Sequence, residues 1–278
     1  MSVVYQGMTQ AELDAQYDQR TLVPDAADHM ALWQGLSEAT VSMRTPRTLS
    51  YGDGPAETML IFEGAAKGAA HFHVHGGAWR QLSAHQSAFV ADGLGADGAH
   101  VAVVEFSLAP HVPLGVMVDQ VRRAFVAFAH HSSGKVFVSA HSSGCHLSAM
   151  LLDGRWQDRA GMTGVFAGLV LASGVYDLEP VRLSARNNYL RLTEADAADL
   201  SPHNHLVETV PPADLLWGDG ELAEFKRQSA DFAGALRARG GTVSAVELPG
   251  LNHFDMYGSF RDPSSAVCQA ARAQMRLG

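Results

Sequence analysis

The 278-residue sequence contains little cysteine and little charge. Only Cys145 and Cys268 occur, too few for a disulfide framework, so we expect two reduced thiols. Charged residues make up 18%, against about 25% in ordinary globular domains. The formal net charge is -9, with no run of Lys or Arg. This balance disfavours nucleic acid and anionic membranes as partners and favours a small-molecule substrate.

Long apolar stretches are also missing. No segment approaches the roughly 18 apolar residues of a membrane helix. Residues 1–20 carry acidic side chains early and have no signal-peptide core, so we expect a cytoplasmic protein. No repeat, low-complexity tract or linker divides the chain, which predicts a single domain over 1–278. The oligomeric state stays open, a homodimer included.

What is present is an alternation of short apolar runs with helix-period segments. The runs are Val- and Leu-rich, as expected for strands buried on both faces, and lie at 57–62, 70–74, 100–106, 135–140, 167–172, 213–217 and 242–248. The first is expected to pair antiparallel with the segment near 39–50. Segments 113–129 and 221–239 space apolar residues three or four apart and predict helices. The pattern predicts an α/β fold, a mostly parallel central sheet with helices on both faces.

Segment 173–206 interrupts this alternation. It is too long for a simple connection and is itself partly helical. Long insertions of this kind commonly roof a binding site. We therefore interpret it as a small cap on the same domain.

The strongest local motif lies in VFVSAHSSGCHLSAML, residues 136–151. A β-branched strand leads into Ala140-His141-Ser142-Ser143-Gly144 and then into a helix-forming segment. This is the context of a nucleophile elbow, G-x-S-x-G, in which Ala140 replaces the first glycine. The motif predicts Ser142 as a nucleophile, with the amide of Ser143 pointing at the reacting carbonyl.

A second motif, His75-Gly76-Gly77-Ala78-Trp79, follows an earlier strand. In the α/β-hydrolase fold the other oxyanion donors lie at this place, and glycine lets the backbone turn its N–H groups inward. We predict an oxyanion hole made by the amides of Gly77, Ala78 and Ser143. Removing one such donor typically costs about 3–4 kcal/mol of barrier.

A serine nucleophile also needs a base and an acid, which follow in the order Ser, acid, His. The base is predicted to be His253, in the loop after the last strand. The acid is predicted to be Glu221, about three residues after the strand ADLLW, with Asp219 as the alternative.

The run His71, His73, His75 also fits a metal site, since alternate strand residues share a face. No matching ligand cluster follows at suitable spacing, and His75 belongs to the glycine motif. We therefore expect His71 and His73 to be buried strand histidines, with neither a metal nor another cofactor.

Beyond the two motifs, the sequence resembles the arylformamidases (kynurenine formamidases), a group of α/β-hydrolases. HGGAW matches their HGGxW motif. The segments 11–20, 117–124, 174–181, 200–204 and 223–229 also look like that family, so the resemblance covers nearly the whole chain.

The resemblance implies an α/β-hydrolase fold with a Ser142–Glu221–His253 triad and oxyanion donors at Gly77 and Ala78. It also implies N-formylkynurenine as the reference substrate. The sequence departs from the family pattern at two positions: Ala140 stands in place of the elbow glycine, and the acid is a glutamate in place of the more familiar aspartate. The identity of the substrate therefore stays open.

We expect a tight acyl pocket and a wide, partly aromatic leaving-group side. Trp79, Tyr176 and Tyr189 are the candidates for its wall, and Arg186 is the candidate partner for a substrate carboxylate. The alternatives are a carboxylesterase or thioesterase with the same triad, a non-catalytic ligand-binding hydrolase fold, and a metal amidohydrolase.

Overall fold

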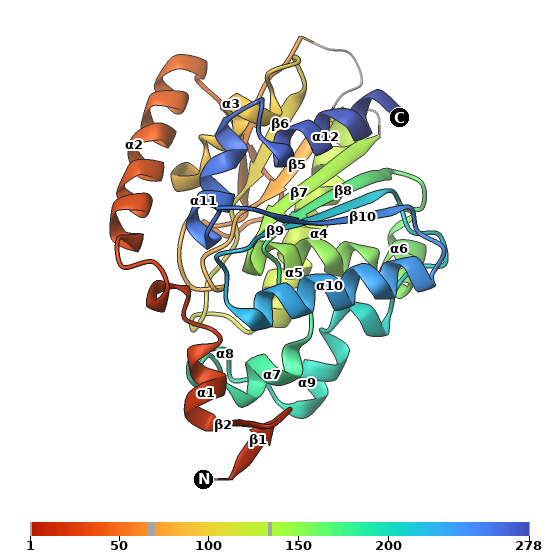
Figure 1. The fold of residues 1–278 in the computed structure, drawn as a ribbon. Coiled ribbons are helices and arrows are strands. Elements are labelled where there is room, and N and C mark those ends of the chain that lie inside the picture. Colours follow the sequence, from red (N-terminus) through yellow and green to blue (C-terminus); the bar gives the residue numbers. More distant parts are fainter. Residues whose placement is uncertain (1, 66–69, 133–134, 278) are drawn as a thin grey trace.

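Eight strands form a central sheet that runs through the molecule, and a separate two-stranded sheet lies in the N-terminal segment (Figure 1). The structure, a computed structural model, describes residues 2–65, 70–132 and 135–277. Within these residues the spatial order of the strands is β10-β9-β8-β7-β5-β6-β4-β3. Their bounds are β3 Arg47–Ser50, β4 Thr58–Phe62, β5 Ala70–Val74, β6 His100–Val104, β7 Val136–His141, β8 Phe166–Ala172, β9 Ala213–Gly218 and β10 Val243–Leu248.

Neighbouring strands run parallel from β10 across to β6 and antiparallel where β4 joins β6 and β3. Strands β5 and β7 are neighbours, with Val74 opposite Ala140. Because they are parallel, the segments that follow them start at the same edge of the sheet. The glycine turn after β5 and the serine turn after β7 therefore meet there.

Helices cover both faces of the sheet (Figure 1). Side chains alternate along the strands, so that in β6 Ala102 and Val104 pack in the core with α4, α5 and α10, whereas Val101 and Val103 pack with α2, α3, α11 and α12. The helix bounds are α2 Ala26–Arg44, α3 Val90–Leu94, α4 Leu114–Ser132, α5 Ser143–Ala149, α6 Gly154–Ala160, α10 Ala223–Ala238, α11 His253–Gly258 and α12 Ala266–Leu277.

Two segments far apart in the sequence lie side by side below the sheet in Figure 1. The first is N-terminal, with β1 (Val3–Tyr5), β2 (Met8–Thr9), α1 (Gln10–Ala15) and the 3₁₀ turn Gln19–Thr21. The second carries α7 (Leu178–Leu183), α8 (Asn187–Leu190) and α9 (Glu194–Asp199), within the predicted cap. The amide of Ala185 donates to Oδ1 of Asp14 at 2.6 Å, which ties the two together.

The predicted α/β architecture is confirmed, and the predicted strands agree with the structure to within two residues at their ends, with one exception. The segment near 39–50 is a strand only over Arg47–Ser50, and its first part belongs to α2. Trp33, Ser37 and Thr40 are buried at helical spacing, so packing against the sheet overrides the β-branched side chains near residue 40. None of the helices in the described ranges combines the length and apolarity needed to cross a bilayer.

Candidate active site

A sharp turn between β7 and α5 carries Ser142. Its backbone has φ 54° and ψ -125°, a strained combination for a residue with a side chain. At Gly144 a Cβ would lie 2.3 Å from the carbonyl oxygen of Val74 and 2.4 Å from that of His75, so only glycine fits. Ala140 is buried in β7 at the other position that must be small. The turn therefore has the form of a nucleophile elbow.

Ser142, His253 and Glu221 lie in a hydrogen-bonded row. Nε2 of His253 is 3.0 Å from Oγ of Ser142, and Nδ1 is 2.8 Å from Oε2 of Glu221. With the proton on Nδ1, the imidazole donates to the carboxylate and presents a lone pair to the hydroxyl. All three residues are buried, so water screens these contacts weakly.

The carboxylate of Glu221 is oriented from its other side as well. Its Oε1 accepts hydrogen bonds from the hydroxyl of Ser173 at 2.6 Å and from the amide of Gly218 at 2.8 Å. Asp219 is exposed, and its Oδ1 accepts from the amide of Gly250 at 2.8 Å. The structure thus brings Glu221, and not Asp219, against the imidazole.

The glycine turn after β5 packs against the elbow. A Cβ on Gly76 would lie 3.0 Å from Cβ of Ser142. Gly77 has φ 101°, and a Cβ there would lie 2.0 Å from the carbonyl oxygen of Gln81, so glycine is required on both grounds. The next residue, Ala78, also has a positive φ of 55°. The backbone of residues 76–78 is therefore held close to the hydroxyl.

Trp79 fixes the glycine turn onto α5. Its amide donates to Oγ of Ser143 at 3.1 Å, and its indole Nε1 donates to Nδ1 of His146 at 3.3 Å. Burial lowers the pKa of His146 to about 4, which keeps this ring neutral and able to accept. Because Trp79 is fully buried, it supports the turn from behind and does not belong to the wall of the cavity described next.

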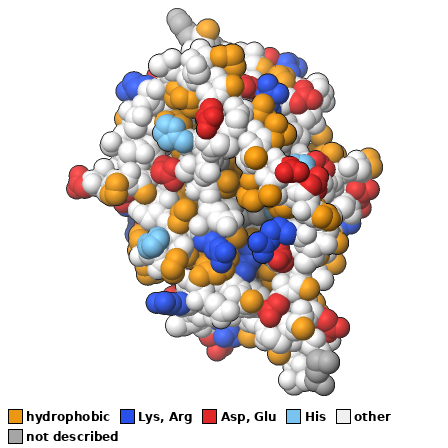
Figure 2. Space-filling model, turned by 90° about the vertical axis from the view of Figure 1, so that its left-hand side faces the viewer, with side chains coloured by type: hydrophobic (Ala, Val, Ile, Leu, Met, Phe, Trp, Pro, Cys, Tyr) orange, Lys and Arg blue, Asp and Glu red, His pale blue; other side chains and the backbone are white. Residues whose placement is uncertain are grey.

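A cavity of about 700 Å³ opens over Ser142 and His253. Its described lining combines residues 14–21 of the N-terminal segment with residues 185–189, the glycine turn and parts of α2 and α11. Figure 2 shows this hollowed face, where hydrophobic and basic side chains gather. Two distant segments therefore share the roof of the cavity.

Of the predicted binding residues, Arg186 and Tyr189 line this cavity and Tyr176 does not. The hydroxyl of Tyr189 donates to the carbonyl oxygen of Ala78 at 3.1 Å. Tyr176 is buried behind the site, where its ring stacks on Phe232 at 4.1 Å between centroids. Large aromatic side chains more often fill a core than face a ligand, which accounts for its place.

Four further residues of the site were not identified from the sequence. Trp33 and Phe254 line the cavity and stack on each other with centroids 5.8 Å apart. Nε2 of Gln19 contacts Oε2 of Glu221 at 3.5 Å. His141 lies beneath the base. Of these, His141 and Phe254 had a sequence signal, because each is adjacent to a predicted catalytic residue.

The histidine run is buried. Both ring nitrogens of His71 lack a hydrogen-bond partner, and burial lowers its pKa to about 3. Nδ1 of His73 contacts Oγ of Ser139 at 2.8 Å, and Nδ1 of His75 contacts the carbonyl oxygen of Gly76 at 2.9 Å. Among the residues that the structure describes, no group of three His, Cys, Asp or Glu side chains is arranged to hold a metal ion.

Comparisons with known proteins agree with this geometry. Residues 71–256 match a family model described as an alpha/beta hydrolase fold. The kynurenine formamidase of Danio rerio is 30% identical over 270 residues, which cover 91% of this chain and 92% of that protein. The kynurenine formamidase of Salmo salar is 31% identical, covering 81% and 80%.

Solved structures show the same fold at lower identity. A crystal structure from Silicibacter sp., provisionally named a thioesterase, superposes with a TM-score of 0.85 at 23% identity, covering 94% of this chain and 99% of that one. An esterase from Pyrobaculum calidifontis superposes with a TM-score of 0.68 at 18% identity, covering 94% and 93%. Together with the sequence relatives, these findings show that the protein is a hydrolytic enzyme that belongs to the α/β-hydrolase family, in its kynurenine formamidase-like group.

Proposed function

We propose that this enzyme hydrolyses aryl formamides, with N-formylkynurenine as the reference substrate. One observation carries the proposal: the hydrogen-bonded row of Ser142, His253 and Glu221 lies in a chain that aligns with a kynurenine formamidase over 91% of its length. The motif residues and the overall sequence thus support the same chemistry.

In the proposed reaction, Nε2 of His253 removes the proton of Ser142 while Oγ attacks the formyl carbon. The tetrahedral intermediate collapses when the C–N bond breaks and the imidazolium gives its proton to the departing arylamine. Water, activated by the same imidazole, then hydrolyses the formyl ester on Ser142 and releases formate. Glu221 holds the Nδ1–H tautomer and stabilises the imidazolium without taking its proton.

The negative charge on the former carbonyl oxygen requires donors close to Ser142. We assign this role to the amides of Gly77, Ala78 and Ser143. Support comes from the glycine turn, which approaches the elbow so closely that a Cβ on Gly76 would meet the Cβ of Ser142 at 3.0 Å. Donors on such a rigid turn need little reorganisation during the reaction.

The aromatic lining of the cavity supports a large aromatic leaving group. Ser142 lies on the sharp turn after β7, and Trp33, Phe254 and Tyr189 line the same cavity of about 700 Å³. Their rings offer an apolar wall to an aniline or a kynurenine ring. Tyr189 stays in our assignment of the aromatic wall, and Trp33 and Phe254 replace Trp79 and Tyr176.

We further propose that residues 1–278 act as one catalytic domain, capped by segment 173–206, in the cytoplasm. The lining supports a single unit, because the N-terminal segment, the cap and the loops after the strands all contribute to one cavity. Both cysteines are free and buried, as in proteins of a reducing compartment. Sedimentation analysis decides whether this unit works alone or as a homodimer.

A carboxylesterase is the second candidate, because an identical triad also cleaves esters and several solved structures of this fold are esterases. The test compares N-formylkynurenine with a short-chain aryl ester, using the parent enzyme and Ser142→Ala. We expect a much higher kcat/KM for the formamide and loss of both activities in Ser142→Ala. Cleavage of the ester alone would favour the esterase, and activity that persists in Ser142→Ala would overturn the nucleophile.

A further inference from the structure

Arg186, in the wall of the cavity above Ser142, is a partly exposed cation without an anionic partner. Among the described residues it forms no ion pair with any Asp or Glu. Asp18, another lining residue, is engaged by Arg20, whose Nε and Nη2 lie 2.7 and 2.8 Å from its two carboxylate oxygens. The pKa of Asp18 is lowered chiefly by its hydrogen bonds to Arg20 and only to a smaller degree by the charge of Arg186, so the described residues give Arg186 no close counterion.

The guanidinium of Arg186 is held in place by aromatic rings and one carbonyl. Nη2 donates to the carbonyl oxygen of Tyr17 at 2.7 Å. Its Cζ lies 5.3 Å from the ring centroid of Tyr17, 5.8 Å from that of Trp79 and 5.9 Å from that of Phe225. Nη1 is buried and has no acceptor among the described residues. The cation–π contacts and the bond to Tyr17 orient the planar group but leave part of its hydrogen-bonding capacity, that of Nη1, unfilled.

Placing part of a cation out of water without a counterion is costly, because the buried part loses water and gains no opposite charge. A ligand carboxylate would supply both the missing acceptor and the missing charge, and the planar guanidinium suits a carboxylate better than an ammonium would. Resting on the proposed function, we propose that Arg186 binds a carboxylate on the leaving-group part of the substrate. The enzyme therefore prefers aryl formamides that carry an acid group over neutral ones.

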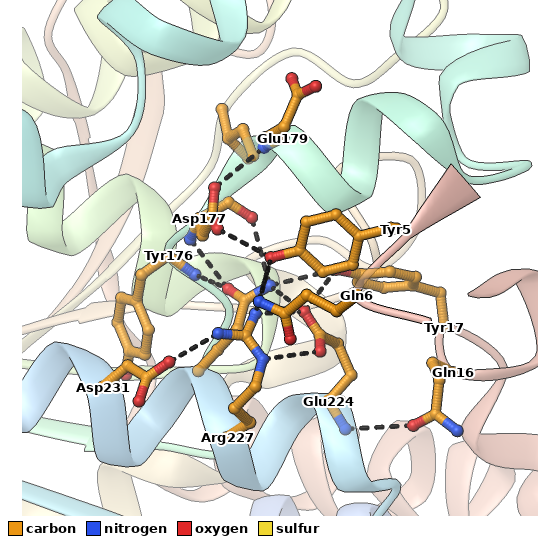
Figure 3. Close-up of polar contacts among 12 residues, drawn as sticks. Tyr5, Gln6, Gln16, Tyr17, Tyr176, Asp177, Glu179, Glu224, Arg227 and Asp231 are labelled. Atoms are coloured by element: carbon orange, nitrogen blue, oxygen red, sulfur yellow. Dashed lines mark hydrogen bonds and ion pairs between the residues drawn. The ribbon is translucent and has the colours of Figure 1, made fainter. Parts of the chain in front are cut away.

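Tyr17 is itself held by a buried polar network, which fixes the carbonyl that receives Arg186 (Figure 3). The hydroxyl of Tyr17 donates to Oε1 of Glu224 at 3.2 Å and accepts from Nε2 of Gln228 at 3.0 Å. Arg227 also binds Glu224, with Nε and Nη2 at 2.9 and 2.7 Å from the two carboxylate oxygens.

The network continues to the other segments of the roof. The hydroxyl of Tyr5 donates to Oδ2 of Asp177 at 3.3 Å, and Nη2 of Arg227 donates to this hydroxyl at 3.3 Å (Figure 3). It therefore joins the N-terminal segment, the start of the cap and α10. The carboxylate of Glu224 is already used by Tyr17, Gln228 and Arg227, so the network supports Arg186 sterically without neutralising it.

The test compares two formamides, one with the amino-acid group that carries the carboxylate and one without it. N-formyl-L-kynurenine carries the carboxylate, and N-(2-acetylphenyl)formamide presents the same aryl formamide without the amino-acid part. Arg186→Met keeps an apolar side chain among the rings and removes the charge. We expect it to lower kcat/KM for N-formyl-L-kynurenine at least about tenfold, mainly through KM. The neutral formamide should change by less than about twofold, which also shows that the variant is folded.

Arg239→Gln removes an exposed charge from the end of α10 and serves as the matched control, with both substrates unchanged. If Arg186→Met lowers kcat/KM equally for the two formamides, Arg186 is a structural residue and the carboxylate site is overturned. An unchanged kcat/KM for N-formyl-L-kynurenine would overturn it as well.

A binding measurement separates this proposal from the proposed function. Isothermal titration compares L-kynurenine with kynuramine, which lacks the carboxylate, on the parent and on Arg186→Met. Tighter binding of L-kynurenine that is lost in Arg186→Met supports the carboxylate site even if neither formamide is hydrolysed. Equal binding of the two compounds by the parent overturns the site even if both formamides are hydrolysed.

Discussion

Nε2 of His141 lies 3.0 Å from the backbone carbonyl oxygen of His253. The two rings are 4.6 Å apart between centroids, and the ring of His141 also stacks on that of Tyr257 at 4.6 Å. Burial, together with the charge of His253, holds the pKa of His141 well below its usual range. A neutral His141 can therefore donate one hydrogen bond to the backbone carbonyl of His253. The elbow thus contacts His253, the proposed base, at its backbone carbonyl through His141 and at its imidazole through Ser142.

We expect His141→Leu to lower kcat about five- to tenfold with little change in KM, because one buried carbonyl loses its donor and the base is held less well. His141→Gln, which can still donate, should recover part of the loss. Steady-state kinetics on both variants check this, with thermal unfolding as a measure of the fold. Identical kinetics of parent and His141→Leu would show that His253 needs no support from this side.

The acid is tested by paired variants. Glu221→Gln removes the negative charge next to Nδ1 of His253 and should lower kcat by about 10³–10⁴-fold, as loss of the orienting carboxylate does in other triads. Asp219→Asn should stay within about twofold of the parent, since Asp219 is exposed and, in the described contacts, its carboxylate accepts a hydrogen bond only from the amide of Gly250. The reverse pattern in kcat would assign the acid to Asp219.

Local motifs predicted the centre of the site because each depends on a few adjacent residues. The elbow at Ser142 and the turn at Gly77 need glycine or small residues at fixed spacing, and the place of Glu221 follows from the end of β9. The fold class followed in the same way from the apolar strands. These features can be predicted from the sequence, because the residues that cause each of them lie close together in the chain.

The walls of the cavity could not be predicted, because they depend on contacts across the whole chain. Gln19 reaches Glu221 over a separation of 202 residues, and no local pattern marks such a contact. Trp33 lies in α2, whose C-terminal part was predicted as strand. Trp79 carries the family motif, yet its conformation buries it behind the turn. Tertiary packing, not local propensity, decides which aromatic side chain faces a ligand.

The glycine turn gives a prediction on stability. Gly77→Ala should destabilise the protein by several kcal/mol, since the added Cβ would lie 2.0 Å from the carbonyl oxygen of Gln81 at a positive φ, and the backbone has to move. Gly234→Ala is the matched control, because it lies within α10 with nothing within 4 Å of the added Cβ. It should stabilise the protein by about 0.5–1 kcal/mol. Urea unfolding measures both, and a mild effect of Gly77→Ala would contradict the close approach.

Acid should destabilise the enzyme through its buried histidines. Burial lowers the pKa of His71 to about 3, against about 6.5 in the unfolded chain. The unfolded state therefore binds more protons below pH 6.5, so the free energy of unfolding falls as the pH decreases from 6.5 towards 3. Above pH 6.5 this contribution is constant. From pH 7 to pH 5, His71 alone should account for a loss of about 2 kcal/mol.

His71→Leu tests this contribution directly. Both ring nitrogens of His71 lack partners, so an apolar side chain of similar size should cost little at pH 7. Urea unfolding at pH 7 and pH 5 should show that the variant loses about 2 kcal/mol less than the parent over this interval. His111→Gln, at an exposed position, should keep the loss of the parent. If His71→Leu loses as much stability as the parent on acidification, His71 is not neutral in the folded state, or another group accounts for the acid sensitivity.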